Sequence, residues 1–208
     1  MARTWRIFGF LAVLAVLAGC GAAEPKWASE ADVTRAAYVH DGPPTITLFT
    51  VINNKNGSGA HSALMVNASQ RIVFDPAGTW HHPQLPERND VIFGMSDPIV
   101  DFYIDYHSRI TYRTVVQEIV VSPEVAQLAM QGILSYGAVP KAQCSNAITS
   151  ILTDIPGFES IPHTWFPKKL SAEFGKFPGA SFEVIYDDSP DDNSGVVVGP
   201  PAHYLLSR

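Results

Sequence analysis

The chain has 208 residues, of which 46% are hydrophobic, and it carries 14 basic against 20 acidic side chains. This length fits a single domain that can bury a sizeable core. A net charge of −6 lacks the basic surface that binding to nucleic acid or to anionic lipid headgroups requires, so we expect neither as a partner.

The N-terminus has the pattern of an export signal. Arg3 and Arg6 precede an apolar run over residues 7–17, which ends in Leu17-Ala18-Gly19-Cys20. A basic start, a short apolar stretch and small residues before the cleavage point describe a secretory signal. The run is too short to span a bilayer, for which about 20 residues are needed. Leu-Ala-Gly-Cys resembles the bacterial lipobox, in which the cysteine is diacylated and becomes the new N-terminus; an ordinary signal peptide that ends in cysteine is the alternative.

We therefore expect a signal peptide over residues 1–19 and a mature protein attached to the membrane by lipid on Cys20. Its expected location is the bacterial cell envelope, facing the periplasm, at the outer rather than the inner membrane. Loss of two arginines would leave 12 of the 14 basic residues against 20 acidic ones, a net charge of −8. Cys144 would then be a lone thiol in an oxidising compartment, where an unpaired thiol is either buried or used.

The next segment changes in composition. Residues 21–44 are rich in Ala, Glu, Asp, Pro and Gly and lack a sustained apolar period. We interpret residues 20–44 as the lipidated Cys20 followed by a tether, with a short helix around residues 30–37. Residues 45–208 are expected to form a single domain.

The first part of this domain predicts strands. Residues 45–52 begin with alternating polar and apolar side chains and end at a loop rich in Asn and Gly. Residues 61–66 and 71–75 predict a hairpin around residues 67–70. A long loop over residues 79–89 follows.

The second part predicts helices between two strands. Residues 91–106 are ambiguous between helix and strand, whereas residues 110–121 are rich in β-branched side chains and predict a strand. Ser122-Pro123-Glu124 is typical of a helix start, and Gly137 and Pro140 end that helix. The remaining elements are a helix from Cys144 to Pro156, a helix over about residues 168–176 and a strand over residues 182–186. This order predicts an α+β domain with an antiparallel sheet packed against helices.

Cys144 begins an amphipathic helix. Apolar residues recur at Ala147, Ile148, Ile151 and Leu152, which places Cys144 in the first turn on the stripe that faces the core. The unpaired N–H groups and the positive end of the helix dipole favour a thiolate there. The same N–H groups would hold an oxyanion formed when the thiolate attacks a carbonyl. The alternative is a buried and inert cysteine, which is common.

A nucleophilic cysteine needs a base and a third group that orients the base. His61 opens a strand after a Gly- and Ser-rich loop, and Asp75 closes the neighbouring strand. With a three-residue hairpin loop over residues 68–70, His61 and Asp75 lie on the same face of the sheet. With a two-residue loop, Asp75 falls on the opposite face and this argument fails. A structural histidine is the alternative for His61.

The order of these residues is similar to that of a known family. A histidine on a strand, a polar residue on the next strand and a cysteine at a later helix start resemble the circularly permuted papain-like fold, which includes permuted NlpC-type cysteine peptidases and lecithin:retinol acyltransferase-like proteins. The match covers roughly residues 61–152. The segment Gly59-Ala60-His61-Ser62-Ala63-Leu64 resembles the histidine strand of the family, and residues 136–152 resemble its cysteine segment.

This resemblance implies a thiol hydrolase, an amidase or peptidase acting on cell-wall peptide, or an acyltransferase. Cys144 is then the nucleophile, His61 the base and Asp75 the orienting group. The rival hypothesis is a non-catalytic binding or structural lipoprotein that keeps the papain-like fold. The sequence leaves the oligomeric state open.

No other motif indicates chemistry, and we expect no cofactor and no metal. His81 and His82 are adjacent and point in different directions, which is typical of a surface loop. The acidic residues between Asp187 and Asp192 lack the spacing of a calcium loop. The other candidates are better explained as core or rim residues: His107, His163, Trp165 and Phe166.

Overall fold

A computed structural model describes residues 22–192, in which seven strands form one sheet in the order β4-β5-β3-β2-β1-β6-β7. All six neighbouring pairs are antiparallel. The strands are β1 (Thr45–Asn53), β2 (Gly59–Asn67), β3 (Arg71–Phe74), β4 (Glu87–Arg88), β5 (Val91–Phe93), β6 (Tyr112–Val120) and β7 (Glu183–Ile185).

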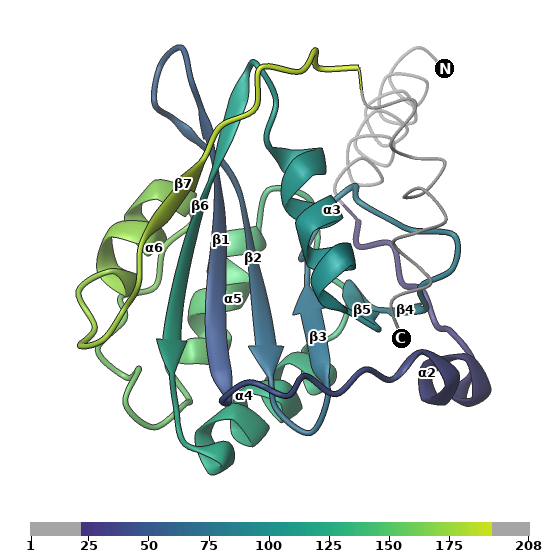
Figure 1. The fold of residues 1–208 in the computed structure, drawn as a ribbon. Helices are drawn as coiled ribbons and strands as arrows, with labels where there is room; N and C mark the ends of the chain where they lie inside the picture. Colours follow the sequence, from purple (N-terminus) through teal and green to yellow (C-terminus); the bar gives the residue numbers. More distant parts are fainter. Residues whose placement is uncertain (1–21, 193–208) are drawn as a thin grey trace, which may run out of the picture.

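Helices cover both faces of this sheet (Figure 1). They are α2 (Glu30–Ala36), α3 (Asp97–His107), α4 (Pro123–Tyr136), α5 (Cys144–Leu152) and α6 (Pro167–Phe174). Helix α3 lies in front of the sheet in Figure 1, and α4 and α5 lie behind it. The prediction of an α+β domain with an antiparallel sheet packed against helices is confirmed.

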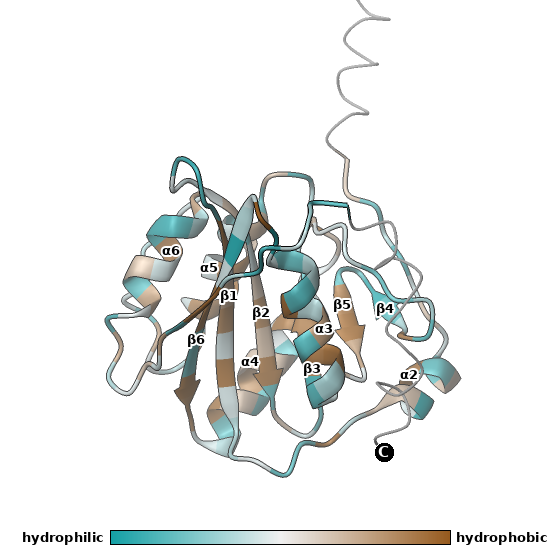
Figure 2. Ribbon diagram, turned by 45° about the horizontal axis from the view of Figure 1, so that its top comes forward, coloured by the Kyte–Doolittle hydropathy of each residue, from teal (hydrophilic) through white to brown (hydrophobic). Residues whose placement is uncertain are grey.

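Alternation along the strands divides the core into two parts. On β2, Leu64 and Val66 pack with residues of α4, α5 and α6, whereas Ala63 and Met65 pack with residues of α3. The period of two in a strand sends successive side chains to opposite faces. Because both faces of the central strands are covered, β1 and β2 show long pale and brown stretches in Figure 2, while the loop that joins them is hydrophilic.

Most elements lie where the sequence predicts them. The ambiguous segment is a strand followed by a helix, β5 and α3, and Pro98 stands in the first turn of α3 after Ser96 at the N-cap. Helix α4 begins after Ser122, whose side chain accepts a hydrogen bond from the N–H of Val125. Helix α5 stops at Leu152, earlier than predicted, because the N–H of Asp154 bonds the Ile151 carbonyl in a tight turn.

The segment interpreted as a tether packs against the domain from Trp27 onward. The N–H of Ala28 donates to the carbonyl of Glu87 at 3.0 Å, and the N–H of Arg71 donates to the carbonyl of Tyr38 at 2.8 Å. Val33 of α2 is buried in the core. The predicted signal peptide and Cys20 lie outside the described residues, and no helix within residues 22–192 is long and apolar enough to cross a membrane.

Candidate active site

The β2–β3 hairpin brings His61 and Asp75 together. Asn67 pairs with Arg71 and Leu64 pairs with Phe74, so the loop has the three residues 68–70 that place His61 and Asp75 on one face. Strand β3 ends at Phe74, and the N–H of Asp75 then donates to the carbonyl of Asp90 at 2.8 Å. The carboxylate Oδ1 lies 2.6 Å from Nε2 of His61.

The Asp75 carboxylate is almost completely buried, with 2% of the side chain exposed. The hydroxyl of Tyr103 donates to the same Oδ1 at 2.8 Å. A Cβ atom on Gly78 would lie 1.8 Å from Oδ2, so only glycine fits beside the carboxylate. Burial raises the pKa of Asp75, but His61, His107 and the Tyr103 hydrogen bond oppose it, and the net pKa is lowered. Asp75 is therefore held in place as an anion.

Cys144 approaches His61 beside β2. The pairing of β2 with β3 ends at Leu64 and Phe74, and the residues of β2 before Leu64 contact the first turn of α5 instead. The N–H of Ser62 and the hydroxyl of Ser145 both form hydrogen bonds to the Cys144 sulfur, the second at 3.9 Å. The hydroxyls of Ser62 and Ser145 lie 3.3 Å apart, which ties α5 to β2. The thiol is buried, with 6% of Cys144 exposed.

The electrostatics of Cys144 and His61 are linked. Burial lowers the pKa of His61, but the Asp75 carboxylate and a hydrogen-bonding contact with Cys144 raise it to about 10. Burial raises the pKa of Cys144, but the hydrogen bond and positive charge of His61 outweigh this, and the net pKa is lowered. Because Asp75 occupies Nε2, Nδ1 is the ring nitrogen of His61 left for the sulfur. Both pKa shifts favour a thiolate–imidazolium pair over a neutral pair.

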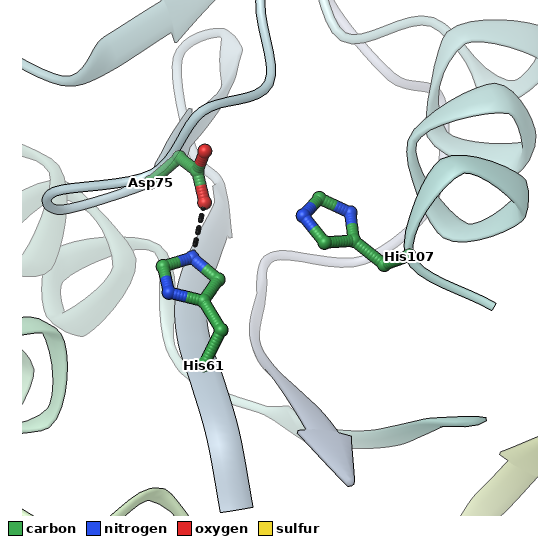
Figure 3. Close-up of side chains that lie close together, drawn as sticks. All are labelled: His61, Asp75 and His107. Atoms are coloured by element: carbon green, nitrogen blue, oxygen red, sulfur yellow. Dashed lines mark hydrogen bonds and ion pairs between the residues drawn. The ribbon is translucent and has the colours of Figure 1, made fainter. Parts of the chain in front are cut away.

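Two further residues complete this cluster: Tyr103, for which the sequence indicated no role, and His107, which was interpreted as a core or rim residue and not as part of a site. Tyr103 and His107 lie one turn apart on α3, and His107 Nδ1 donates to the carbonyl of Tyr103 at 2.8 Å. The ring of His107 stacks on that of His61 with centroids 5.9 Å apart, and it points toward Asp75 (Figure 3). Burial lowers the pKa of His107 to about 4, so this ring is neutral at pH 7. The i,i+4 spacing of the two residues after a helix-start pattern at Ser96 is the signal that would have found them.

Asp90 joins the two loops that carry the site. Its Oδ2 accepts hydrogen bonds from the N–H of Ala77, at 3.2 Å, and from the N–H of Val139, at 2.8 Å. Ala77 lies just after Asp75 and Ala142 just before Cys144, and both have positive φ values, 58° and 65°. Such backbone conformations are costly for a residue with a side chain and cluster at functional sites.

Comparisons with known proteins do not extend this description. No family model, curated protein or solved structure matches the chain.

The other residues considered in the sequence make contacts outside the His61–Asp75 pair, although Asp191 lines the same cavity as His107. His81 is exposed, while His82 is buried next to the rings of Trp80 and Phe102. Asp187 and Asp191 accept hydrogen bonds from Arg109 and Thr111, so they fix the C-terminal segment to the turn before β6. Three further candidates are also exposed: His163, Trp165 and Phe166.

Proposed function

We propose that this protein is a thiol hydrolase or acyltransferase that uses Cys144 as its nucleophile. One observation carries the proposal: residues from α5, β2 and the end of β3 meet so that Asp75 holds His61 at 2.6 Å, and His61 and Cys144 lie close enough for each to shift the pKa of the other. A nucleophile, a base within hydrogen-bonding reach and a group that orients the base are the elements of this chemistry. The circularly permuted papain-like class is the proposed fold family.

The proposed reaction has two steps. The Cys144 thiolate attacks the carbonyl carbon of an amide or ester, and the carbon–nitrogen or carbon–oxygen bond breaks. The leaving amine or alcohol takes the proton from Nδ1 of His61, and a thioester remains on Cys144. His61 then removes a proton from water, or from an acceptor nucleophile, which attacks the thioester and restores the thiol.

The start of α5 supports the charge that develops in these steps. The N–H of Cys144 is in the first turn of the helix, where N–H groups have no partner within the helix. These groups and the helix dipole would hold the oxyanion of the tetrahedral intermediate. Asp75, whose pKa is lowered so that it is held as an anion, stabilises the positive charge of His61 in each state in which His61 is protonated.

The substrate and location follow from the sequence and remain part of the proposal. A signal peptide with a lipobox supports a lipid-anchored enzyme at the periplasmic side of the cell envelope, where peptide amides of the cell wall are the abundant substrate. A lipid or thioester acyl group is the second substrate class. If Cys20→Ser does not release the protein from the membrane fraction, lipid anchoring is wrong.

The decisive experiment measures the chemistry of the thiol. We expect p-nitrophenyl acetate to acetylate Cys144 of the folded protein, detected as one added acetyl group by intact mass. Alkylation by iodoacetamide should proceed near pH 6, since an unperturbed thiol with a pKa of about 8.5 is almost wholly protonated there. His61→Ala should shift the alkylation profile to higher pH and slow acetylation.

Two controls interpret this result. Cys144→Ala should take up no acetyl group, and the exposed His163→Ala should behave as the wild type. A thiol that reacts only after unfolding, at every pH, would contradict the enzyme and favour the non-catalytic binding lipoprotein.

A further inference from the structure

A set of possible metal ligands overlaps the proposed active site. His61, Asp75 and His107 each offer a nitrogen or oxygen atom, and these atoms all lie within 4.8 Å of one another. Figure 3 shows the ring of His107 pointing toward the hydrogen-bonded pair of His61 and Asp75 from the opposite side. Two imidazoles and one carboxylate are a common ligand set for zinc and related metal ions.

The hydrogen bonds of these residues orient them as metal ligands. Because a carbonyl oxygen only accepts, the bond from His107 Nδ1 to the Tyr103 carbonyl places the proton on Nδ1 and leaves the lone pair on Nε2. The Tyr103 hydroxyl holds Asp75 Oδ1 at 2.8 Å. Metal-binding histidines and carboxylates are usually fixed by such outer partners. Tyr103 supplies both of them here, one from its main chain and one from its side chain.

The cluster borders a cavity at His107. A cavity of about 240 Å³ is lined by His107, by Ala60 next to His61, and by Thr79 in the loop after Asp75. Arg109 also lines this cavity, but its guanidinium is paired with Asp105 and Asp187. A hydrated ion can therefore reach His107 from a side that Cys144 does not line.

We propose that His61 Nε2, Asp75 and His107 Nε2 bind one divalent transition-metal ion of the zinc class, with water in the fourth position. Ligand bonds of about 2.0–2.2 Å would fit a tetrahedral ion after His61 and Asp75 move apart by several tenths of an ångström. The ion replaces the proton between these two residues, which is released to solvent. Cys144 is not one of the three residues of this ligand set.

Metal binding and the catalytic arrangement exclude each other. The ion occupies Nε2 of His61, which is the atom that Asp75 holds in the metal-free protein. Zinc would therefore inhibit acyl transfer reversibly, a consequence that rests on the proposed function. The binding itself does not depend on it.

The test uses the full chain carrying Cys20→Ser and Cys144→Ala, so that no thiol can bind metal and no catalysis is involved. Co²⁺ should give one tetrahedral absorption spectrum, and calorimetry should show one Zn²⁺ bound. His107→Gln and Asp75→Asn in this background should weaken binding by more than the roughly 10–100-fold that loss of an outer partner costs. Tyr103→Phe should fall in that range, and His163→Gln should leave the affinity unchanged.

Affinity that is unchanged in folded His107→Gln, or the absence of any tetrahedral Co²⁺ spectrum, would overturn the metal site. Circular dichroism and thermal unfolding of each variant establish that it is folded. In the chain that retains Cys144, Zn²⁺ should reduce acetylation and a chelator should restore it, with each variant compared with its own metal-free rate. Metal binding without any acetylation would refute the enzyme and leave the metal site standing.

Discussion

The two faces of the sheet differ in what they bury. The face covered by α4, α5 and α6 buries a large and mainly apolar cluster, which includes Leu64, Ile148 and Phe174. The face covered by α3 buries a smaller apolar cluster that continues into the polar groups of Asp75 and Tyr103. The first face supplies most of the apolar burial that stabilises the fold, and the second holds charge in a fixed geometry.

Cys144 connects these faces. Its helix, α5, belongs to the apolar layer, yet its sulfur contacts His61, which projects on the α3 face. This contact is possible because the pairing of β2 with β3 ends at Leu64. Mutations can therefore test whether residues on the apolar face determine stability while residues on the α3 face determine the proposed reaction.

The largest expected effect is on acyl transfer. Cys144→Ala should reduce the rate of acyl transfer by roughly 10⁶-fold, as removal of a nucleophile does, because no thioester can form. The free energy of unfolding should change far less, since alanine keeps the α5 stripe intact. Steady-state turnover and urea unfolding measure the two quantities on the same preparation. A loss of unfolding free energy as large as that caused by truncating a buried apolar side chain would indicate that Cys144 has a structural role in the core.

The second effect tests the negative charge of Asp75, which lies on the α3 face. Asp75→Asn should reduce turnover by about 10²–10⁴-fold, less than Cys144→Ala, because Asp75 orients and stabilises the base without forming the bond.

The same variant should change how stability depends on pH. His61 has a folded pKa of about 10 against an ordinary value of 6.5, so its contribution is full below pH 6.5 and is lost as the pH rises through 10. The unfolding midpoint of the wild type should therefore decrease across that window. Asp75→Asn should flatten this decrease, and an identical slope in both proteins would contradict the His61–Asp75 ion pair.

The third effect belongs to the opposite face. Ile148 is fully buried in the apolar cluster, so Ile148→Ala should lower the free energy of unfolding by about 2–5 kcal/mol. The alkylation profile of Cys144 should stay close to that of the wild type at temperatures where the variant is folded. Ile148→Val, with an expected loss of about 0.5–1.5 kcal/mol, is the matched control.

The smallest effect concerns Tyr103. Tyr103→Phe removes one hydrogen bond to a carboxylate and should cost about 1.5–3 kcal/mol of stability. The loss of this donor should also raise the pKa of Asp75, because the hydrogen bond favours the anion. NMR titration of the Asp75 carboxyl carbon measures this shift, which a purely packing role for Tyr103 would not produce.

Local patterns predicted most of the fold. Alternation identified β1, and Ser122-Pro123 marked the start of α4. The hairpin was predicted with a loop of either two or three residues. The observed register has three, which places His61 and Asp75 on the same face.

Other features depend on contacts that no local pattern contains. Residues 27–44 lack an apolar period, yet they dock through main-chain hydrogen bonds and a few buried side chains such as Val33. Tyr103 and His107 were missed because their segment mixes β-branched and aromatic residues, so its period was unclear. Their contacts with Asp75 and His61 span 28 and 46 positions of sequence.

The contacts of Asp90 bear on when the site forms during folding. Its side chain binds the turn after Asp75 and the loop before Cys144, which join regions separated by more than 60 residues. Contacts of such long range form late, because the intervening chain must first be closed into a loop. The thiol therefore gains its histidine partner only when folding is nearly complete. The proposed activation of Cys144 therefore depends on the finished fold.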